Sequence, residues 1–252
     1  MSAEVKLTDE VRDALKAALV VGPALKLSGK LDRQVYQRVA KAIELLGGKW
    51  NLKAGCHVFE DDAEAVVADA ISTGLVVDAK KYFQFFETPP DVAAVLVEHA
   101  DLGTAHRILE PSAGKGAIIR AIRAVLPKAD VAAYELWDKN VAELRKLGLP
   151  VIAGDFLLQC DVTFDRIVMN PPFTRGQDVD HVVHAWNLLN AGGRIASVMA
   201  ESWRFHGARK YVTFRDFVER QGGEWHPLPE GAFAPSGTNV RAGILVLDRG
   251  TE

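Results

Sequence analysis

The sequence predicts an α/β protein with a doubly wound, mostly parallel sheet, preceded by a small, mainly helical N-terminal unit. Two observations support this prediction. From residue 88 onward, short apolar runs alternate with stretches of helical periodicity, which is typical of βαβ units. Before that point, basic and acidic residues are segregated along the chain. We therefore expect a small basic unit over residues 1–80 and an α/β domain over residues 81–252.

The composition is that of an ordinary globular protein. The 252 residues are enough for one sizeable α/β domain with a small appendage, and 48% of them are apolar. No apolar run reaches the roughly 18 residues that a membrane span needs, and the N-terminus lacks the apolar stretch of a secretion signal. We therefore expect a cytoplasmic protein without a membrane partner, and the sequence leaves its oligomeric state open.

The two cysteines predict no metal centre. Cys56 and Cys160 are far apart in sequence and lack metal-ligand spacing, so we expect both to be reduced thiols. Cys56 and His57 form the one pair that could contribute to a zinc site, and the sequence offers no second pair.

A local basic segment distinguishes the N-terminal unit, although the net charge of the chain is −3. Residues 22–56 contain seven basic and two acidic side chains, whereas residues 57–78 contain six acidic side chains and no lysine or arginine. In the basic segment, phosphate contacts could come from Arg33, Lys41, Lys49 and Lys53, and Trp50 could stack on a base. A solvated helix face explains these residues about equally well. The unit is therefore a candidate nucleic-acid contact.

Helical periodicity predicts two helices in the N-terminal unit, over residues 31–46 and 63–71, and residues 56–59 form a short extended candidate. In the α/β domain, apolar runs predict strands at residues 107–109, 131–134, 151–153, 166–169, 195–199 and 242–247. Helices are expected near residues 117–125, 138–147 and 178–190. Because ligands of such sheets bind at the carboxyl ends of the strands, we expect the functional site there.

A glycine-rich turn, residues 110–116, follows the first strand of this domain. Gly114 and Gly116 allow the backbone to approach a ligand closely. A dinucleotide site would have a third glycine three residues later, where Ile119 stands. Glu110 opens the turn, which favours a ligand with a positive centre over a pyrophosphate.

Acidic residues also end the next two strands. Glu135 occupies the usual place of a carboxylate that binds ribose hydroxyls, although a helix cap or a surface ion pair would explain it too. Asp155 can accept a hydrogen bond from an adenine amino group while Phe156 packs on the ring. A plain strand-end turn is the alternative for this pair.

The sharpest signal is the segment Asn170, Pro171, Pro172 and Phe173. Two successive prolines remove two backbone donors and fix φ twice, which leaves oxygen acceptors pointing rigidly toward a ligand. The side-chain oxygen of Asn170 and the carbonyl of Pro171 can bind both N–H groups of a planar amine and favour a pyramidal nitrogen. Phe173 can stack on the ring that carries the amine.

Together, residues 110–116, 155–156 and 170–173 resemble the motifs of class I S-adenosylmethionine-dependent amino-methyltransferases, above all DNA adenine-N6 enzymes of the phage or mobile-element type. Residues 86–89 and 231–238 look like two further segments of that family. The resemblance implies a Rossmann-like sheet of about seven strands. It also implies a cofactor site for S-adenosyl-L-methionine made of Thr88, Pro89, Glu110, Pro111, Ser112, Gly114, Gly116, Glu135, Leu136, Asp155, Phe156 and Asn170.

The same resemblance assigns the chemistry to Asn170, Pro171, Pro172 and Phe173. Phe233 in the late segment would help Phe173 to hold the target base. The expected partner is DNA or RNA. Structured RNA or a protein glutamine amide are alternative substrates, because the same motif serves all of them, and a catalytically silent cofactor-binding subunit is the alternative from another class.

Overall fold

The computed structural model describes residues 4–60, 62–77, 86–149, 151–158 and 162–251. The chain divides into two compact units, Met1–Tyr82 and Phe83–Glu252, which are described separately. The boundary that the sequence suggests near residue 80 lies outside the described residues. Within the described part of the chain, none of the helices has the length and apolar character that a membrane span requires.

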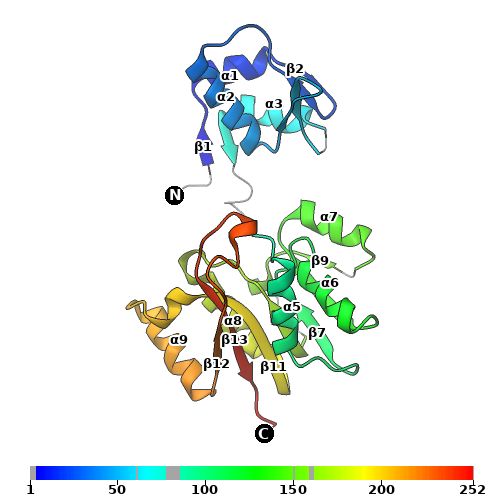
Figure 1. The fold of residues 1–252 in the computed structure, drawn as a ribbon, viewed down its shortest axis with the longest axis vertical. Coiled ribbons are helices and arrows are strands. Elements are labelled where there is room, and N and C mark those ends of the chain that lie inside the picture. Colours follow the sequence, from blue (N-terminus) through cyan, green and yellow to red (C-terminus); the bar gives the residue numbers. More distant parts are fainter. Residues whose placement is uncertain (1–3, 61, 78–85, 150, 159–161, 252) are drawn as a thin grey trace. The chain divides into compact units, whose positions relative to one another are not determined.

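In its described residues, the first unit combines three helices with two small antiparallel sheets (Figure 1). The helices are α1 (Asp9–Lys16), α2 (Arg33–Leu45) and α3 (Glu64–Thr73). One sheet pairs β1 (Glu4–Lys6) with β6 (Leu75–Val77), and the other has the order β2-β3-β5-β4. Its strands are β2 (Leu19–Val21), β3 (Ala24–Lys26), β4 (Lys49–Asn51) and β5 (Cys56–Val58).

The core of this unit explains its helices. Asp32 begins α2 because its side chain accepts the backbone N–H of Gln34 at 2.8 Å. Val39 and Ile43, one helical turn apart, are fully buried in the same cluster as Leu25 of β3 and Leu15 of α1. Most of the small strands were not expected from the sequence, because three-residue strands are too short to show an alternating pattern.

The second unit contains the predicted doubly wound sheet, whose seven strands have the order β12-β13-β11-β10-β7-β8-β9. β13 runs antiparallel to both of its neighbours, and the other neighbouring pairs are parallel. The strands are β7 (Arg107–Glu110), β8 (Asp130–Glu135), β9 (Val151–Ala153), β10 (Phe164–Met169), β11 (Leu189–Ala200), β12 (Glu224–Pro227) and β13 (Ala242–Asp248).

Helices cover both faces of this sheet. Side chains of α5 (Pro90–His99), α6 (Ala117–Val125) and α7 (Asp138–Lys146) belong to one buried cluster. Those of α8 (Gln177–Asn187) and α9 (Arg209–Arg220) belong to a second cluster on the other face. In Figure 1, α7 lies near β9 and α9 lies beside β12, at opposite edges of the sheet. The predicted fold class is therefore confirmed.

Several details go beyond the sequence prediction or differ from it. The helix expected to reach residue 190 ends at Asn187, and β11 begins at Leu189 rather than near residue 195. The register between β10 and β11 shifts at its start, where β11 passes through two glycines. Three elements of this unit were not predicted: α5, which lies before the first expected strand, α9, which is mostly polar, and β12, which has only four residues.

Candidate active site

The predicted motifs meet at one edge of the sheet. Glu110 ends β7, Glu135 ends β8, Asp155 follows β9 and Asn170 follows β10. These four strands are neighbours and parallel, in the order β10-β7-β8-β9, so their carboxyl ends lie together. The fold thus gathers side chains that are widely separated in the sequence.

The glycine turn is held by Glu135. One carboxylate oxygen of Glu135 accepts the backbone N–H of Gly114 at 2.6 Å, and the other accepts that of Trp137 at 2.7 Å. Gly114 and Gly116 have φ values of 55° and 81°, which favour glycine. A Cβ atom at Gly116 would also lie 2.9 Å from Leu144. Glu135 therefore organises the turn that follows β7.

Glu110 is a buried acid beside the same turn. Only 1% of its surface is exposed, and its Oε2 atom has no hydrogen-bond partner among the described residues. Burial first, and then the neighbouring Glu135 carboxylate, raise the pKa of Glu110 well above its usual value. Burial also raises the pKa of Glu135. Two adjacent carboxyl groups of this kind fit a cationic ligand and would repel a pyrophosphate. Pro111 is buried and Ser112 is half-buried in this turn.

At the end of β9, the acidic residue bonds within its own turn and, among the described residues, not to another strand end. Asp155 accepts the backbone N–H of Leu157 at 2.9 Å, which forms the strand-end turn that was the alternative interpretation. The ring of Phe156 is 2% exposed and contacts Tyr134 and His184 in the core. Contact of Phe156 with a ligand ring stays a prediction. Leu136, in contrast, is exposed beside Glu135.

The catalytic candidate Asn170 is oriented by a hydrogen bond. Its Nδ2 atom donates to Oγ1 of buried Thr88 at 3.0 Å. Its Oδ1 atom is buried and accepts no hydrogen bond from the described residues. Pro171 is buried and Pro172 is half-buried. Pro89, the N-cap residue of α5, directly follows Thr88. The arrangement presents an unsatisfied acceptor at the end of β10.

Two further contacts join the late segment to this part of the structure. The rings of Phe173 and Phe233 meet edge to face, with centroids 6.3 Å apart. Phe233 is only 1% exposed and belongs to the core, whereas Phe173 is partly exposed. Ser236 donates a 2.5 Å hydrogen bond to the carbonyl oxygen of Glu87. Phe233 therefore supports Phe173, and its predicted contact with a base is indirect in this conformation.

Lys49 and Trp50 belong to the other unit. Both are exposed on β4, and Trp50 contacts His57 with ring centroids 5.1 Å apart. The basic segment around them is partly neutralised, because Arg38 pairs with Glu10 and Lys41 pairs with Glu44. The contact of Lys49 and Trp50 with nucleic acid stays a prediction.

Two charged residues near the catalytic loop were not singled out as site residues from the sequence. Asp178, at the start of α8, is buried and accepts the backbone N–H groups of Val179 and Ala200, each at 3.1 Å. Burial raises its pKa to about 6. Arg175 has a positive φ of 58° although it is not glycine. Only the position of Arg175, two residues beyond Phe173 of the double-proline motif, could have indicated its importance.

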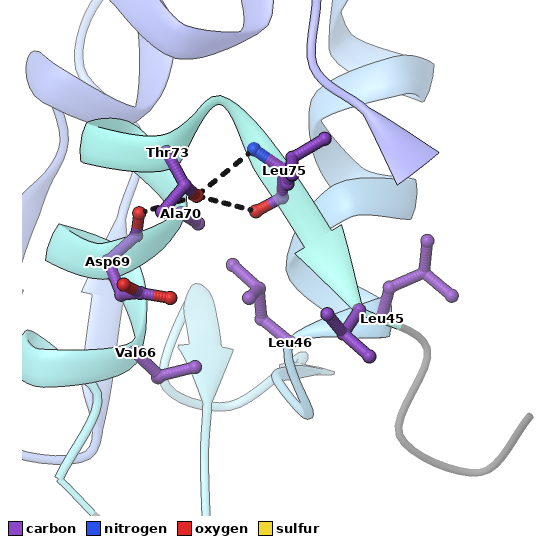
Figure 2. A pocket seen from close by; sticks show the side chains of 8 residues that line it. Leu45, Leu46, Val66, Asp69, Ala70, Thr73 and Leu75 are labelled. Atoms are coloured by element: carbon purple, nitrogen blue, oxygen red, sulfur yellow. Dashed lines mark hydrogen bonds between the residues drawn. The ribbon is translucent and has the colours of Figure 1, made fainter. Parts of the chain in front are cut away.

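A cavity of about 260 Å³ lies in the first unit (Figure 2). It is bounded by the end of α2, by α3 and by β6. Asp69 is the one ionisable group among its lining residues, which are Leu45, Leu46, Val66, Asp69, Ala70, Thr73, Leu75 and Val77. It contains none of the predicted site residues and therefore has no part in the candidate active site.

The fold and the grouping of the strand-end motifs define a class I methyltransferase domain. Residues 86–219, more than half of the chain, match the family model described as Methyltransferase small domain. The chain belongs to this family. S-adenosyl-L-methionine is the methyl donor that this membership implies, and the buried carboxylates of Glu110 and Glu135 fit its positive charge.

Many solved structures share the fold, and three of them are compared with this chain. One, from work on a type I restriction–modification system, has a TM-score of 0.56, 16% identity, and covers 88% of this chain and 56% of that one. The type I restriction enzyme EcoKI M protein has a TM-score of 0.54 and is 16% identical in sequence, and the match covers 97% of this chain and 58% of that protein. A putative class I S-adenosylmethionine-dependent methyltransferase from Listeria monocytogenes has a TM-score of 0.51 and is 16% identical in sequence. This match covers 65% of this chain and 60% of that protein. The chain thus spans less than two thirds of each of these proteins.

Proposed function

We propose that this methyltransferase acts on an exocyclic amino nitrogen, with adenine N6 in DNA as its substrate. One observation carries the proposal: the buried Oδ1 atom of Asn170 lacks a partner among the described residues, and Thr88 holds the amide so that this oxygen remains available. A buried acceptor without a donor is unfavourable, so a ligand N–H group at this position would satisfy it.

The chemistry follows from these acceptors. The lone pair of an aromatic amine is delocalised into the ring and is a weak nucleophile. Asn170 Oδ1 and the carbonyl of Pro171 accept its two N–H groups and favour a pyramidal nitrogen with an available lone pair. Bound S-adenosyl-L-methionine supplies an electrophilic methyl group. The new N–C bond forms as the S–C bond breaks, and the nitrogen then loses one proton to solvent, so no enzyme nucleophile is needed.

Other residues at the sheet edge would hold the donor and the base. We assign Glu110, Glu135 and the turn at Gly114 to the donor, because buried acids and open backbone meet there. Partly exposed Phe173 would stack on the target ring, with Phe233 as its support. A base in a duplex would first have to flip out of the stack to reach Asn170.

DNA is favoured over the alternatives by two of the structural neighbours, whose descriptions refer to type I restriction–modification. The phage or mobile-element origin stays a prediction. Structured RNA and a protein glutamine amide are the runner-up substrates, since each offers a planar amino group. A silent cofactor-binding subunit is disfavoured because the glycine turn and the Asn170 acceptor are both intact. Lys49 and Trp50 of the first unit would add contacts to the nucleic acid.

The test is methyl transfer to several substrates in parallel. The full chain is incubated with tritium-labelled S-adenosyl-L-methionine and, separately, with unmethylated DNA, total RNA and total protein, and the Asn170→Ala variant serves as the blank. We expect label in DNA, recovered as N6-methyladenine after digestion to nucleosides. Label found only in RNA or only in protein would show that this molecule, and not DNA, is the substrate. Binding of the donor without any methyl transfer would show that the protein is a catalytically silent subunit.

A further inference from the structure

The backbone turns sharply just after the catalytic loop. Arg175 lies two residues beyond Phe173, and its φ and ψ of 58° and 22° are left-handed. Residues other than glycine, asparagine and aspartate rarely adopt this conformation, and it persists only where the surroundings impose it. Backbone outliers of this kind cluster at functional sites, which makes residue 175 a candidate for a role in substrate binding.

Side chains from the start of α9 hold this turn. Lys210 Nζ donates to the carbonyl oxygen of Arg175 at 3.2 Å and pairs with Asp180 at 2.6 Å. The ring of Tyr211 fills the space beside Gly176, where a Cβ atom would lie 2.7 Å from the Tyr211 hydroxyl oxygen. The turn after the catalytic loop is therefore fixed by α9, and with it the backbone of Arg175.

The side chain of Arg175, by contrast, is unpaired. It is exposed, and no hydrogen bond or ion pair to its guanidinium occurs among the described residues. Arg209, directly before Lys210 at the start of α9, is likewise exposed and without such a partner in the described part of the chain. The charge of Lys210 is already neutralised by Asp180. Within the regions that the structure describes, two cations thus lack a counter-charge: Arg175, in the turn after the catalytic loop, and Arg209, at the start of the helix that holds this turn.

An exposed aromatic side chain lies shortly before Arg209 in the sequence. Phe205 is 72% exposed, in the loop that leads from the end of β11 to α9. Arg215 fixes this loop by donating to the carbonyl oxygens of Trp203 at 2.6 Å and His206 at 3.0 Å. Cations together with an exposed ring on a fixed loop are typical of surfaces that bind nucleic-acid strands.

We propose that Arg175 and Arg209 bind backbone phosphates of the substrate strand next to the base in the catalytic loop. The proposal rests on the proposed function and names the surface of the α/β domain that grips the nucleic acid. Arginine suits this role because its planar guanidinium binds phosphate oxygens in pairs. The fixed backbone of Arg175, two residues after Phe173, keeps this cation near the strand that carries a base stacked on Phe173.

The test compares DNA binding and turnover of full-length variants. Arg175→Gln removes the charge, Arg175→Lys retains it, and Arg175→Gly removes it while relieving the left-handed strain. Arg220→Gln is the matched control, because Arg220 is an exposed arginine at the other end of α9. For each protein we measure KM for DNA, Kd for a fluorescent duplex at several salt concentrations, Kd for S-adenosyl-L-methionine and the melting temperature.

Arg175→Gln and Arg175→Gly should each weaken DNA binding by roughly tenfold at low salt, the effect of losing one charge-assisted hydrogen bond. The slope of log Kd against log salt should become shallower by about 0.9 for either variant, and by about 1.8 when Arg209→Gln is added. Arg175→Lys should keep the wild-type slope, and Arg220→Gln should match the wild type throughout. Donor affinity should be unchanged in every variant.

The two proposals fail differently. If the wild type methylates DNA but Arg175→Gln and Arg175→Gly leave its affinity and salt slope unchanged, the phosphate contact is wrong and the proposed function stands. If the wild type neither binds nor methylates nucleic acid, and labels protein instead, both proposals are overturned.

Discussion

The side-chain amide of Asn170 donates to the hydroxyl oxygen of Thr88 at 3.0 Å, across 82 residues of sequence. This bond turns the amide so that its nitrogen faces Thr88 and its oxygen is left buried and unsatisfied by the described residues. Thr88, which the sequence suggested as a cofactor contact, therefore also positions the residue that would accept the substrate amine. The segment before α5 and the loop after β10 act as one structure.

Replacing Thr88 tests this relationship. Thr88→Val keeps the shape but removes the acceptor for Asn170 Nδ2, so we expect kcat to fall by roughly tenfold, the effect of one hydrogen bond that orients a reacting group. Thr88→Ser retains the hydroxyl and should stay near wild type. Single-turnover transfer at saturating donor provides the measurement. If Thr88→Val raises the Kd for the donor but leaves the transfer rate unchanged, Thr88 binds the cofactor and does not orient Asn170.

Asn170→Ala removes the acceptor itself. We expect methyl transfer to fall on the order of 10²–10³, because the oriented acceptor acts in a site shielded from water. Donor affinity, measured by calorimetry, should change by less than about tenfold, since the acceptor serves mainly the transition state. Asn190→Ala is the matched control, because Asn190 lies at the opposite end of the sheet and bonds to Asp165. Wild-type turnover of Asn170→Ala would remove the residue from the mechanism.

Glu110→Gln should stabilise the ligand-free protein at neutral pH. The folded protein raises the pKa of Glu110, mainly through burial, so the carboxyl group stays protonated in the folded state after it has ionised in the unfolded chain. Its contribution to stability is complete at pH values below the unfolded pKa and is lost as pH rises toward the folded pKa. The glutamine cannot ionise and avoids this loss.

We therefore expect the melting temperature of Glu110→Gln to exceed that of the wild type at neutral pH and to match it in mild acid, below the unfolded pKa of the carboxyl group, where both side chains are neutral. Donor binding should weaken in the variant at neutral pH, because the wild-type carboxyl group can give up its proton when the sulfonium binds, whereas the amide cannot become negatively charged. Equal melting curves at both pH values would show that Glu110 does not titrate on folding.

The glycine turn should depend on Glu135. Glu135→Ala removes the acceptor that binds Gly114 N–H, and Gly114→Val places a β-branched residue at a φ of 55°. Both variants should lose measurable donor binding in calorimetry, whereas Glu143→Ala, which removes an exposed carboxylate from α7, should bind normally. Binding of NADH in place of the methyl donor would contradict the assignment of the turn.

The first unit is tested by charge reversal, with Arg33→Glu, Lys41→Glu and Lys49→Glu combined. If this unit binds DNA, affinity should fall and the slope of log affinity against log salt should flatten by about 0.9 for each phosphate that is no longer bound. All three side chains are exposed, and the ion pair of Lys41 with Glu44 is a surface pair, so stability should change little. Lys128→Glu in the second unit serves as the control. Unchanged melting temperature and DNA affinity would make the first unit a scaffold.

Much of the second unit was predictable, because its strands are buried apolar runs and its helices have a regular apolar face. The six expected strands correspond to β7, β8, β9, β10, β11 and β13. α9 was missed because only Phe214 and Val218 are buried on an otherwise polar helix. Of the small strands of the first unit, β5 corresponds to the extended segment expected at residues 56–59. The others were missed because pairing across the sheet, and not a local pattern, stabilises three residues as a strand.

The sequence by itself determined the local chemistry of the site: the glycines of the turn, the acids that end two strands and the rigid double proline after Asn170. These features depend on backbone preferences that each residue carries with it. Only the tertiary structure decided which groups become partners, such as Thr88 with Asn170 and Phe233 with Phe173. Burial and strand order set those partners, because contacts between residues distant in sequence arise from packing that no local pattern encodes.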